Sequence, residues 1–311
     1  MKICLIDAGI FIDKEELLTP LEIMGKVQVF QGIPETIDEV VARAKDAEII
    51  AFGLMQFTNE MLDKLPNLKI LQFIGTGVRN FVDVDYAASK GIKVLNIEGY
   101  GSNAVAEFAV SMGLAISKKI CQADKILKTN RWTIDDLMGK EIVGSTVGVI
   151  GTGSIGKLVA EKYIALGANV IACDIYENAD LKEKYGVKYK TINDIFNESD
   201  IVTLHMKVTE DNEKIIDKKC FSLMKKNAIL VNVARAELVN MEDLYKALIA
   251  NEIGGAAIDV YGQEPPSTKD YLLAQLDNVV ATPHIAYYTQ EANDNSIKMM
   301  VASILAASYK S

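Results

Sequence analysis

Histidine and tryptophan are scarce in this chain of 311 residues, which contains two of the former and one of the latter. Its four cysteines are scattered, at Cys4, Cys121, Cys173 and Cys220. No two of them have the spacing of metal ligands, and with so few histidines a metal site is not expected. Thiols distributed in this way are typical of a protein that keeps them reduced, which favours a cytoplasmic location.

Excess positive charge is also absent, because the formal net charge is −9 at pH 7. This balance argues against nucleic acid or an anionic membrane as a partner. No apolar run is long enough to span a bilayer, and the first residues form a short strand-like run ending at Asp7 rather than a secretion signal. The 50% of hydrophobic and 24% of charged residues are instead typical of a soluble globular enzyme, and the length suits two domains.

A glycine-rich turn lies near the middle of the chain, Gly151-Thr152-Gly153-Ser154-Ile155-Gly156. It follows a strand-like run, residues 146–150, and precedes apolar residues at helical spacing, which is the context that a G-x-G-x-x-G motif requires. In such a motif the first glycine permits a tight turn and the second lets the backbone approach a pyrophosphate. The third lets helix and strand pack closely. The amides at the start of the helix then face the phosphates of a dinucleotide.

An acidic residue stands about 20 residues beyond these glycines, where a second strand-like run ends at Asp174. A carboxylate at this place accepts hydrogen bonds from the adenosine ribose and would repel a 2′-phosphate, so NAD is expected rather than NADP. Ile175 and Tyr176 follow it and offer no cation for a phosphate. An accidental glycine turn is the alternative, but strand, helix and acid are all in place.

Short apolar runs alternate with amphipathic ones along the first third of the chain. Strands are predicted at residues 3–6, 27–30, 49–51, 70–73 and 93–95, and helices at residues 36–45 and 83–90, the latter closed by Gly91. A second α/β unit is predicted from residue 146 to about 282, with strands near Val147, Val170, Val187, Ile201, Ile229, Ala256 and Val279. The alternation predicts the α/β class, with parallel sheets covered by helices.

Two long helices complete the predicted organisation. The first covers residues 103–119, is capped by Ser102 or Asn103, and is apolar around most of its circumference, so we expect it to be buried between two domains. The second covers residues 290–309 and carries one apolar face, with which it can pack back on the first domain. A cleft at such a junction is a common place for a ligand.

Three ionisable residues, Arg235, Glu264 and His284, each follow a predicted strand. Taken singly, each has an ordinary alternative: a surface ion pair for the arginine, a solvated turn for the glutamate, and a packed structural role for the histidine. The carboxyl ends of parallel strands, however, line one crevice. Together the three residues predict an anion clamp beside an oriented acid–base pair.

With these motifs the chain resembles the D-isomer-specific 2-hydroxyacid dehydrogenases over most of its length. The matching runs are residues 99–107, the glycine turn with Asp174, residues 232–235, Asp259-Val260 with Glu264-Pro265, and residues 282–286. The resemblance implies two Rossmann-like domains with parallel sheets. A discontinuous, flavodoxin-like substrate domain would comprise residues 1–98 and 286–311, and an NAD-binding Rossmann domain residues 99–285.

The resemblance also implies an NAD-dependent enzyme that interconverts a 2-keto acid and a D-2-hydroxy acid. Arg235 would bind the substrate, His284 would donate and accept the proton, and Glu264 would be the partner of the histidine. The implied cofactor-binding residues are Gly151, Gly153, Ser154, Ile155, Gly156, Asp174, His205, Val233, Ala234 and Asp259. The implied substrate-binding residues are Thr76 and Gly77, through their amides, with Leu54, Tyr100 and Tyr287 around the substrate side chain.

Phe52 and Met55 are expected beside Leu54 in this apolar lining, which favours pyruvate or a larger aliphatic or aromatic keto acid. Their alternative is a place in the core. The sequence departs from the family pattern near the site at Lys207, at Arg79 and at Ala236, where the family usually has glycine. The two cations keep a hydroxypyruvate-like or phosphorylated substrate open. A second alternative is a protein that senses NAD(H) without turnover.

A homodimer built from the cofactor domains is expected, on the basis of the apolar content around the first long helix and Trp132. By the resemblance this region packs on a partner. Burial of Trp132 inside its own chain is the alternative.

Overall fold

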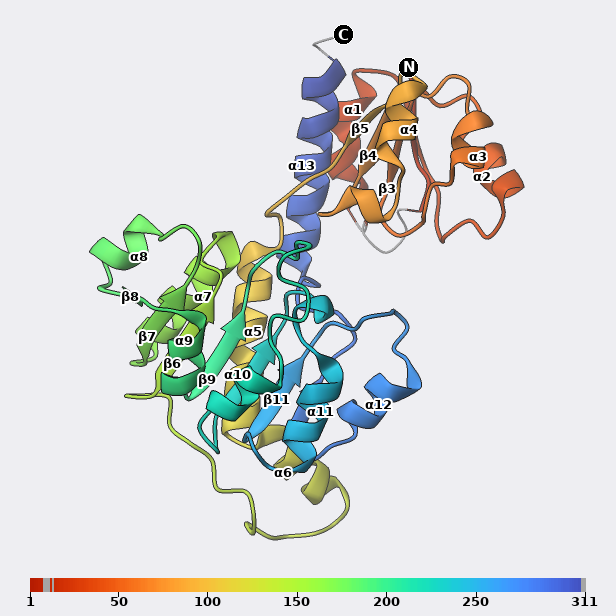
Figure 1. Ribbon diagram of the computed structural model, residues 1–311. Coiled ribbons are helices and arrows are strands. Elements are labelled where there is room, and N and C mark those ends of the chain that lie inside the picture. The colour runs from red at the N-terminus through yellow and green to blue at the C-terminus, as the bar shows by residue number, and fades with distance from the viewer. Residues whose placement is uncertain (8–11, 13, 309–311) are drawn as a thin grey trace. The chain divides into compact units, whose positions relative to one another are not determined.

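The computed structural model of the chain describes residues 1–7, 12 and 14–308. The chain divides into two compact units, a first unit of Met1–Gly101 with Tyr288–Ser311 and a second unit of Ser102–Tyr287. Each unit contains its own parallel sheet (Figure 1). The predicted α/β class with two parallel sheets is therefore confirmed. The division falls at residues 101 and 287, where the sequence analysis places it at 98 and 285.

The sheet of the first unit has the strand order β2-β1-β3-β4-β5, with every neighbouring pair parallel. This is the order of a flavodoxin-like sheet. Its strands are β1 (Lys2–Leu5), β2 (Lys26–Val29), β3 (Ile49–Phe52), β4 (Ile70–Phe73) and β5 (Lys93–Leu95). All five predicted strands are present, because each is a short apolar run bounded by polar residues.

Helices cover both faces of this sheet. They are η2 (Glu15–Leu18), α1 (Thr19–Glu22), α2 (Ile37–Ala44), α3 (Asn59–Asp63), η3 (Val78–Asn80), α4 (Val84–Ser89) and α13 (Gln290–Ser308). The side chains of Thr36, Thr58 and Asp83 cap α2, α3 and α4 by accepting a backbone hydrogen bond. Helix α13 contacts η2, α1 and β4, and its buried residues include Ile297, Met300 and Ile304. Tyr309, the predicted end of this helix, lies outside the described residues.

The sheet of the second unit has the order β12-β11-β10-β9-β6-β7-β8 and is parallel throughout. Its strands are β6 (Thr146–Ile150), β7 (Asn169–Cys173), β8 (Lys188–Tyr189), β9 (Ile201–Leu204), β10 (Ile229–Asn232), β11 (Gly255–Ile258) and β12 (Val279–Ala281). Because side chains alternate along a strand, neighbouring residues such as Ile201 and Val202 enter two different cores.

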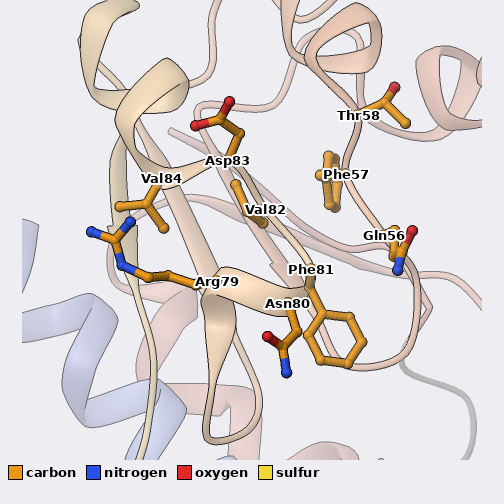
Figure 2. Close-up of a pocket in the computed structure, with 9 residues that line it drawn as sticks. All are labelled: Gln56, Phe57, Thr58, Arg79, Asn80, Phe81, Val82, Asp83 and Val84. Atoms are coloured by element: carbon orange, nitrogen blue, oxygen red, sulfur yellow. The ribbon is translucent and has the colours of Figure 1, made fainter. Parts of the chain in front are cut away.

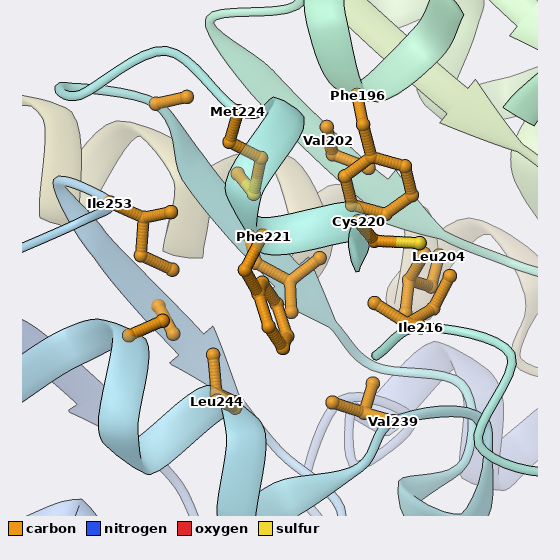
Figure 3. Packing of buried hydrophobic residues seen from close by; sticks show 14 of the residues in the cluster. Phe196, Val202, Leu204, Ile216, Cys220, Phe221, Met224, Val239, Leu244 and Ile253 are labelled. Atoms are coloured by element: carbon orange, nitrogen blue, oxygen red, sulfur yellow. The ribbon is translucent and has the colours of Figure 1, made fainter. Parts of the chain in front are cut away.

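These two cores lie on opposite faces of the sheet. One contains Phe196 of α9 (Ile192–Glu198), Phe221 of α10 (Lys218–Leu223) and Leu244 of α11 (Met241–Ile249), as Figure 3 shows. The other contains residues of α5 (Ser102–Ser117) and α7 (Ser154–Ala165). The remaining helices of this unit are α6 (Ile120–Lys128), α8 (Ala179–Glu183), η4 (Ala236–Leu238) and α12 (Thr268–Ala274).

The first long helix differs from its prediction at its first residues. It begins at Ser102, so Ser102 and Asn103 are its first residues and not its cap. Its buried residues pack within the second unit, against α7, β10, β11 and β12, while Glu107 and Ser111 are exposed. Within the part of the chain that the structure describes, no helix is both long and apolar enough to cross a membrane.

Candidate functional site

The glycine turn lies between β6 and α7, and its three glycines have different surroundings. A side chain at Gly156 would meet the carbonyl oxygen of Gly151 at 1.8 Å, and one at Gly151 would meet the backbone of His205 at 2.6 Å, so both places need glycine. Gly151 also has a φ of +90°, which favours glycine. Gly153 has open space where a side chain would be, and no side chain caps α7 after it. Backbone and helix amides are thus accessible to a pyrophosphate, and the turn fits a dinucleotide.

Asp174 follows β7 and its carboxylate is hydrogen bonded to the glycine turn. Its Oδ2 accepts from the backbone N and from Oγ1 of Thr152, the latter at 3.1 Å, and its Oδ1 accepts from the backbone N of Tyr176 at 3.2 Å. Tyr189 and Asn178 join this network. The sequence analysis identified Asp174 but missed these partners, because Tyr189 lies on a separate strand.

His205 follows β9 directly behind the glycine turn. Its Nε2 lies 2.8 Å from Oγ1 of Thr203. The residue keeps some exposed surface, yet its imidazole lies in the interior of the unit, and burial lowers the pKa of His205 to about 3. His205 is therefore neutral at physiological pH, and it packs against the glycine turn.

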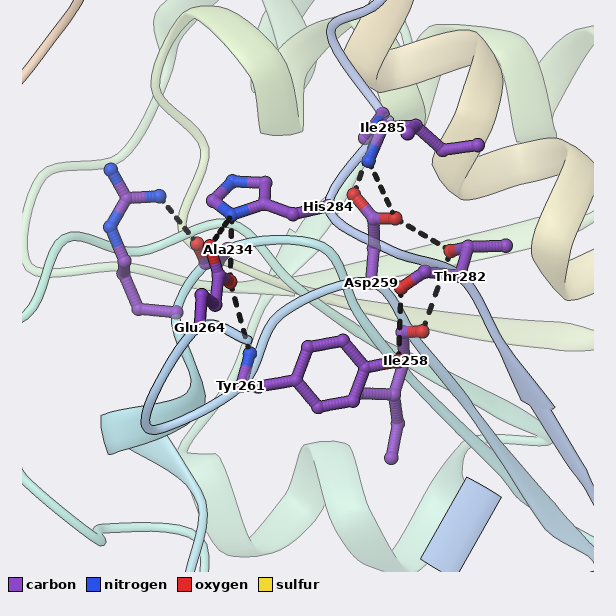
Figure 4. Close-up of polar contacts among 10 residues, drawn as sticks. Ala234, Ile258, Asp259, Tyr261, Glu264, Thr282, His284 and Ile285 are labelled. Carbon is purple, nitrogen blue, oxygen red and sulfur yellow. Dashed lines mark hydrogen bonds and ion pairs between the residues drawn. The ribbon is translucent and has the colours of Figure 1, made fainter. Parts of the chain in front are cut away.

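Arg235, Glu264 and His284 come from three adjacent strands. They follow β10, β11 and β12, which are parallel neighbours, so the three residues lie at the same edge of the sheet. Nδ1 of His284 lies 2.8 Å from Oε1 and 2.9 Å from Oε2 of Glu264 (Figure 4). The guanidinium of Arg235 is exposed, and its Nη1 donates to the carbonyl of Ala234 at 2.7 Å. The structure thus brings together the predicted acid–base pair and places an exposed cation at the same sheet edge.

A buried carboxylate holds the turn that carries His284. Asp259 is fully buried, and it accepts hydrogen bonds from Oγ1 of Thr282 at 2.6 Å and from the backbone N of Ile285 and Ala286 at 3.0 and 2.9 Å (Figure 4). His284 has a φ of +53°, an unusual conformation for a residue with a side chain. These hydrogen bonds stabilise it, a role of Asp259 that the sequence pattern did not reveal.

Two further contacts tie the neighbouring loops together. The hydroxyl of Tyr261 donates to the carbonyl of Thr282 at 2.9 Å, and burial, with the nearby Asp259 charge, raises the pKa of Tyr261 to about 12. Asn232, the last residue of β10, is buried. It donates to the carbonyl of Arg235 at 2.9 Å and accepts from the backbone N of Ala234 at 3.0 Å. Ala236 then begins η4 without a positive φ, so this turn does not need the glycine that is usual in the family pattern.

The predicted substrate residues of the first unit follow β3 and β4. Gly77 has a φ of +86°, and the exposed Thr76 donates from Oγ1 to the carbonyl of Ile97 at 3.4 Å. Asp7, only 1% exposed, accepts from the backbone N of Gly53, Leu54 and Met55 at 2.8, 2.8 and 2.9 Å. Asp7 therefore holds the loop that carries Leu54, although the sequence analysis gave it no role.

The expectation for Phe52 and Met55 is wrong. Both are buried in the core of the first unit, where the ring of Phe52 packs on those of Phe57 and Phe73 with centroids 4.9 and 5.1 Å apart. Alternation along β3 directs Phe52 to the face that α2 and α3 cover, so only Leu54 of the three keeps an exposed surface. Tyr100 and Tyr287 are half-buried, and the ring of Tyr287 meets that of His284 edge to face at 6.2 Å.

The two cations that depart from the family pattern, Arg79 and Lys207, lie in ordinary surface surroundings. Arg79 pairs with Asp85 at 3.2 Å, and the carbonyl of the exposed Lys207 accepts from Asn212 at 2.8 Å. Arg79 also lines a surface hollow of about 410 Å³, formed by residues 56–58 and 79–84 (Figure 2). None of the predicted substrate residues lines this hollow. Over the described ranges, no cluster of three or more His, Cys, Asp or Glu could hold a metal ion.

The comparisons with known proteins agree on one family. Residues 110–286 match the model described as D-isomer specific 2-hydroxyacid dehydrogenase, NAD binding domain. The chain is 38% identical over 280 residues to D-3-phosphoglycerate dehydrogenase of Methanocaldococcus jannaschii, covering 89% of this chain and 52% of that protein, so it spans about half the length of this relative. It is 37% identical over 284 residues to hydroxypyruvate reductase of Thermotoga maritima, covering 91% of this chain and 88% of that protein.

A solved structure shows the same likeness. D-lactate dehydrogenase from Aquifex aeolicus, complexed with NAD and lactic acid, matches with a TM-score of 0.81 and 29% identity, covering 100% of this chain and 96% of that chain. These matches confirm the resemblance that was drawn from the motifs.

Proposed function

We propose that this chain, which belongs to the D-isomer specific 2-hydroxyacid dehydrogenase family, carries out the reaction of that family through Arg235, Glu264 and His284. The family is one of NAD-dependent oxidoreductases that interconvert 2-keto and D-2-hydroxy acids. The observation that carries the residue assignment is the hydrogen bond between His284 and Glu264 at the ends of neighbouring strands. An imidazole held by a carboxylate beside an exposed guanidinium suits acid–base chemistry on a carboxylate substrate.

The two units would have different roles. We assign NAD binding to residues 99–285 and substrate binding to residues 1–98 with 286–311. The residues that would hold NAD are Gly151, Gly153, Ser154, Ile155, Gly156, Asp174, His205, Val233, Ala234 and Asp259. When bound, the reduced cofactor supplies a hydride to the ketone carbon. The uncapped start of α7 and the open space at Gly153 support this assignment.

The chain's own residues would then manage charge and proton. Because Nδ1 of His284 faces Glu264, its Nε2 is left to hold a proton, which it gives to the carbonyl oxygen in the reductive direction. Glu264 orients the ring through the hydrogen bond to Nδ1. Arg235 carries a planar cation suited to two oxygens at once, and so would bind the substrate carboxylate and polarise the ketone. The amides of Thr76 and Gly77 would bind the same carboxylate.

The substrate side chain is proposed to meet Leu54, Tyr100 and Tyr287. With Phe52 and Met55 in the core, this lining is smaller than the sequence suggested, but it remains apolar and aromatic. It favours a keto acid with an apolar side chain, such as pyruvate or an aromatic analogue. The relatives named above include a phosphoglycerate dehydrogenase and a hydroxypyruvate reductase. A hydroxypyruvate-like or phosphorylated keto acid is therefore the alternative substrate. The ion pair between Arg79 and Asp85 leaves that arginine less available to a phosphate.

A panel of 2-keto acids with NADH tests this function. Pyruvate, phenylpyruvate, glyoxylate, hydroxypyruvate and 3-phosphohydroxypyruvate would be compared by the loss of nicotinamide absorbance, with chiral analysis of the product. We expect oxidation of NADH and a D-hydroxy acid. His284→Ala should lower kcat by about 100-fold or more, because positioned acid–base catalysis contributes that much. Glu264→Gln should lower kcat less and leave NADH affinity nearly unchanged. Silence across the panel with NADH still bound would contradict the enzyme and favour an NAD(H) sensor.

A homodimer and a cytoplasmic location are also proposed. Trp132, Ile134 and Met138 are 90, 84 and 91% exposed within the single chain, an apolar surface that a partner subunit would cover. The alternative, burial of Trp132 in its own chain, does not occur. All four cysteines are free thiols, which supports a reducing compartment.

A further inference from the structure

A continuous line of hydrogen bonds runs from the backbone of Asn178, through Tyr189 of β8 and Thr152, to Asp174. Asp174 is the carboxylate proposed to bind the adenosine ribose. The backbone N of Asn178 lies 2.8 Å from Oη of Tyr189, and Oη of Tyr189 lies 2.9 Å from Oγ1 of Thr152. Oγ1 of Thr152 lies 3.1 Å from Oδ2 of Asp174. Thr152 is buried and the other three residues are half-buried, so these hydrogen bonds are shielded from competing water.

The direction of this line is determined by its first member. A backbone N–H can only donate, so Oη of Tyr189 accepts from Asn178 and turns its single hydrogen toward Thr152. Oγ1 of Thr152 accepts that hydrogen and has one hydrogen of its own, which it donates to Asp174. An ionised carboxylate can only accept, so the line ends there. Every donor in this relay of Asn178, Tyr189, Thr152 and Asp174 has one acceptor.

The relay leaves Asp174 held on one side and open on the other. Oδ2 receives the N–H and the O–H of Thr152, while Oδ1 receives the N–H of Tyr176 and has a lone pair left for a ribose hydroxyl. The side chain of Asn178 also donates to the carbonyl of Thr152 at 3.3 Å, which ties the glycine turn to the loop after β7. Asp174 is thus held at both oxygens and cannot easily swing away.

Cations near this carboxylate are already engaged. Lys182 pairs with Glu177 and Lys157 pairs with Asp180, and the residues directly after Asp174, Ile175 and Tyr176, are exposed and uncharged. A 2′-phosphate placed here would therefore meet a negative charge, and these two lysines are already paired with carboxylates. A mobile carboxylate could turn aside to reduce that repulsion, whereas a fixed one cannot.

We propose that Tyr189 and Thr152 are positioning residues that set the selectivity for NAD over NADP by holding the carboxylate of Asp174 in place and directed at the adenosine ribose. This inference rests on the proposed NAD site, and goes beyond it by assigning part of the selectivity to residues that need not touch the cofactor. Removing the hydroxyl of either residue should change the ratio of the affinities for NADH and NADPH, and not only the affinity for NADH.

Titration of nicotinamide fluorescence with NADH and NADPH, in the absence of substrate, measures this ratio directly. The unmutated protein should bind NADH more tightly. Tyr189→Phe and Thr152→Val break the relay at different points with little change of shape, and each should narrow the ratio of the two Kd values by about threefold to tenfold. Thr152→Ser keeps the hydroxyl and should retain the ratio.

Tyr163→Phe is a matched control. Tyr163 is buried in the same unit, and among the described residues its hydroxyl has no hydrogen-bond partner. Its removal deletes the same atom without touching the relay, so the ratio should not move. Thermal melting of each variant establishes that it is folded. Should one relay variant fail to fold, the other decides the question, since each breaks the same line.

The outcomes separate this inference from the proposed function. If the unmutated protein binds neither cofactor, the proposed NAD site is wrong. If it prefers NADH but Tyr189→Phe and Thr152→Val leave the ratio unchanged, the relay is merely structural and the inference is overturned. A ratio that narrows equally in Tyr163→Phe would also overturn it, because the effect would then be one of general packing.

Discussion

Two buried carboxylates, Asp7 and Asp259, show how single residues shape this molecule. Each accepts hydrogen bonds from successive backbone amides of a loop: Asp7 from residues 53–55, and Asp259 from residues 285 and 286 together with Thr282. A buried charge is costly unless it is hydrogen bonded, and here each carboxylate has several donors. Both loops carry residues that we propose to face the substrate, and each acid holds the backbone of the loop in its own unit.

His205 should make stability depend on pH. Its pKa is lowered by burial from 6.5 to about 3, so below pH 6.5 the unfolded chain binds a proton that the folded chain does not. The free energy of unfolding should therefore fall as the pH drops from about 6.5 toward 3, by up to about 1.4 kcal/mol for each pH unit. Urea unfolding at pH 5.0, 5.75 and 6.5 would measure this slope.

His205→Gln removes the titrating group and keeps a polar side chain of similar length. In that variant the decline between pH 6.5 and 5 should be shallower by the same amount. A variant with the slope of the unmutated protein would show that His205 is protonated in the folded state. The carboxylates whose pKa values are lowered, such as Asp180 beside Lys157, contribute at lower pH and do not obscure this window.

At the scale of elements, the glycines between β6 and α7 have two different roles: Gly156 is needed for packing, and Gly153 for binding the cofactor. Gly156→Ala would place a methyl group 1.8 Å from a backbone oxygen, which cannot move aside without shifting α7 against β6. We expect a loss of at least about 3 kcal/mol of folding free energy. Gly153→Ala has open space and a φ of −65°, so it should change stability by less than about 0.5 kcal/mol.

In Gly153→Ala the affinity for NADH should change strongly, although the stability should not. Its methyl group would occupy the space through which a pyrophosphate approaches, and the affinity for NADH should fall about tenfold or more. Chemical unfolding and NADH titration of the same variant measure both quantities. Unchanged NADH affinity in Gly153→Ala would show that the phosphates bind elsewhere.

At the scale of the whole molecule, the exposed apolar side chains of Trp132, Ile134 and Met138 predict the assembly. Light scattering at micromolar concentration should give the mass of a dimer, because two-fold pairs are the commonest closed assembly and this surface is costly to leave in water. Ile134→Asp should shift the mass toward a monomer. Ile23→Asp, at an isoleucine of the first unit that is 83% exposed, is the matched control and should remain a dimer. A monomeric mass for the unmutated protein would refute the proposal.

The sequence by itself determined local structure, that is, the positions of the strands and of the glycine turn. The twelve strands of the described residues lie where short apolar runs predicted them, and the glycine turn could be recognised because its strand and helix adjoin it in the chain. The sheet-edge placement of Arg235, Glu264 and His284 followed from the same patterns, since each residue lies in the segment that follows a strand. Short helices such as α1 and α3 were missed, because four or five residues are too few to show a helical period.

Tertiary structure decided which side chains meet across the sheets. Asp7 reaches amides 46 to 48 residues away, and Tyr189 reaches Thr152 across 37 residues; both contacts depend on which strands are neighbours and on their register. The same register directs Phe52 into the core and leaves Leu54 at the surface. An apolar run has no preference for one partner over another until the sheet forms. The elements could therefore be predicted from the chain, while the partners of Asp7, Asp174 and Asp259 were determined only by the packing of strands distant in sequence.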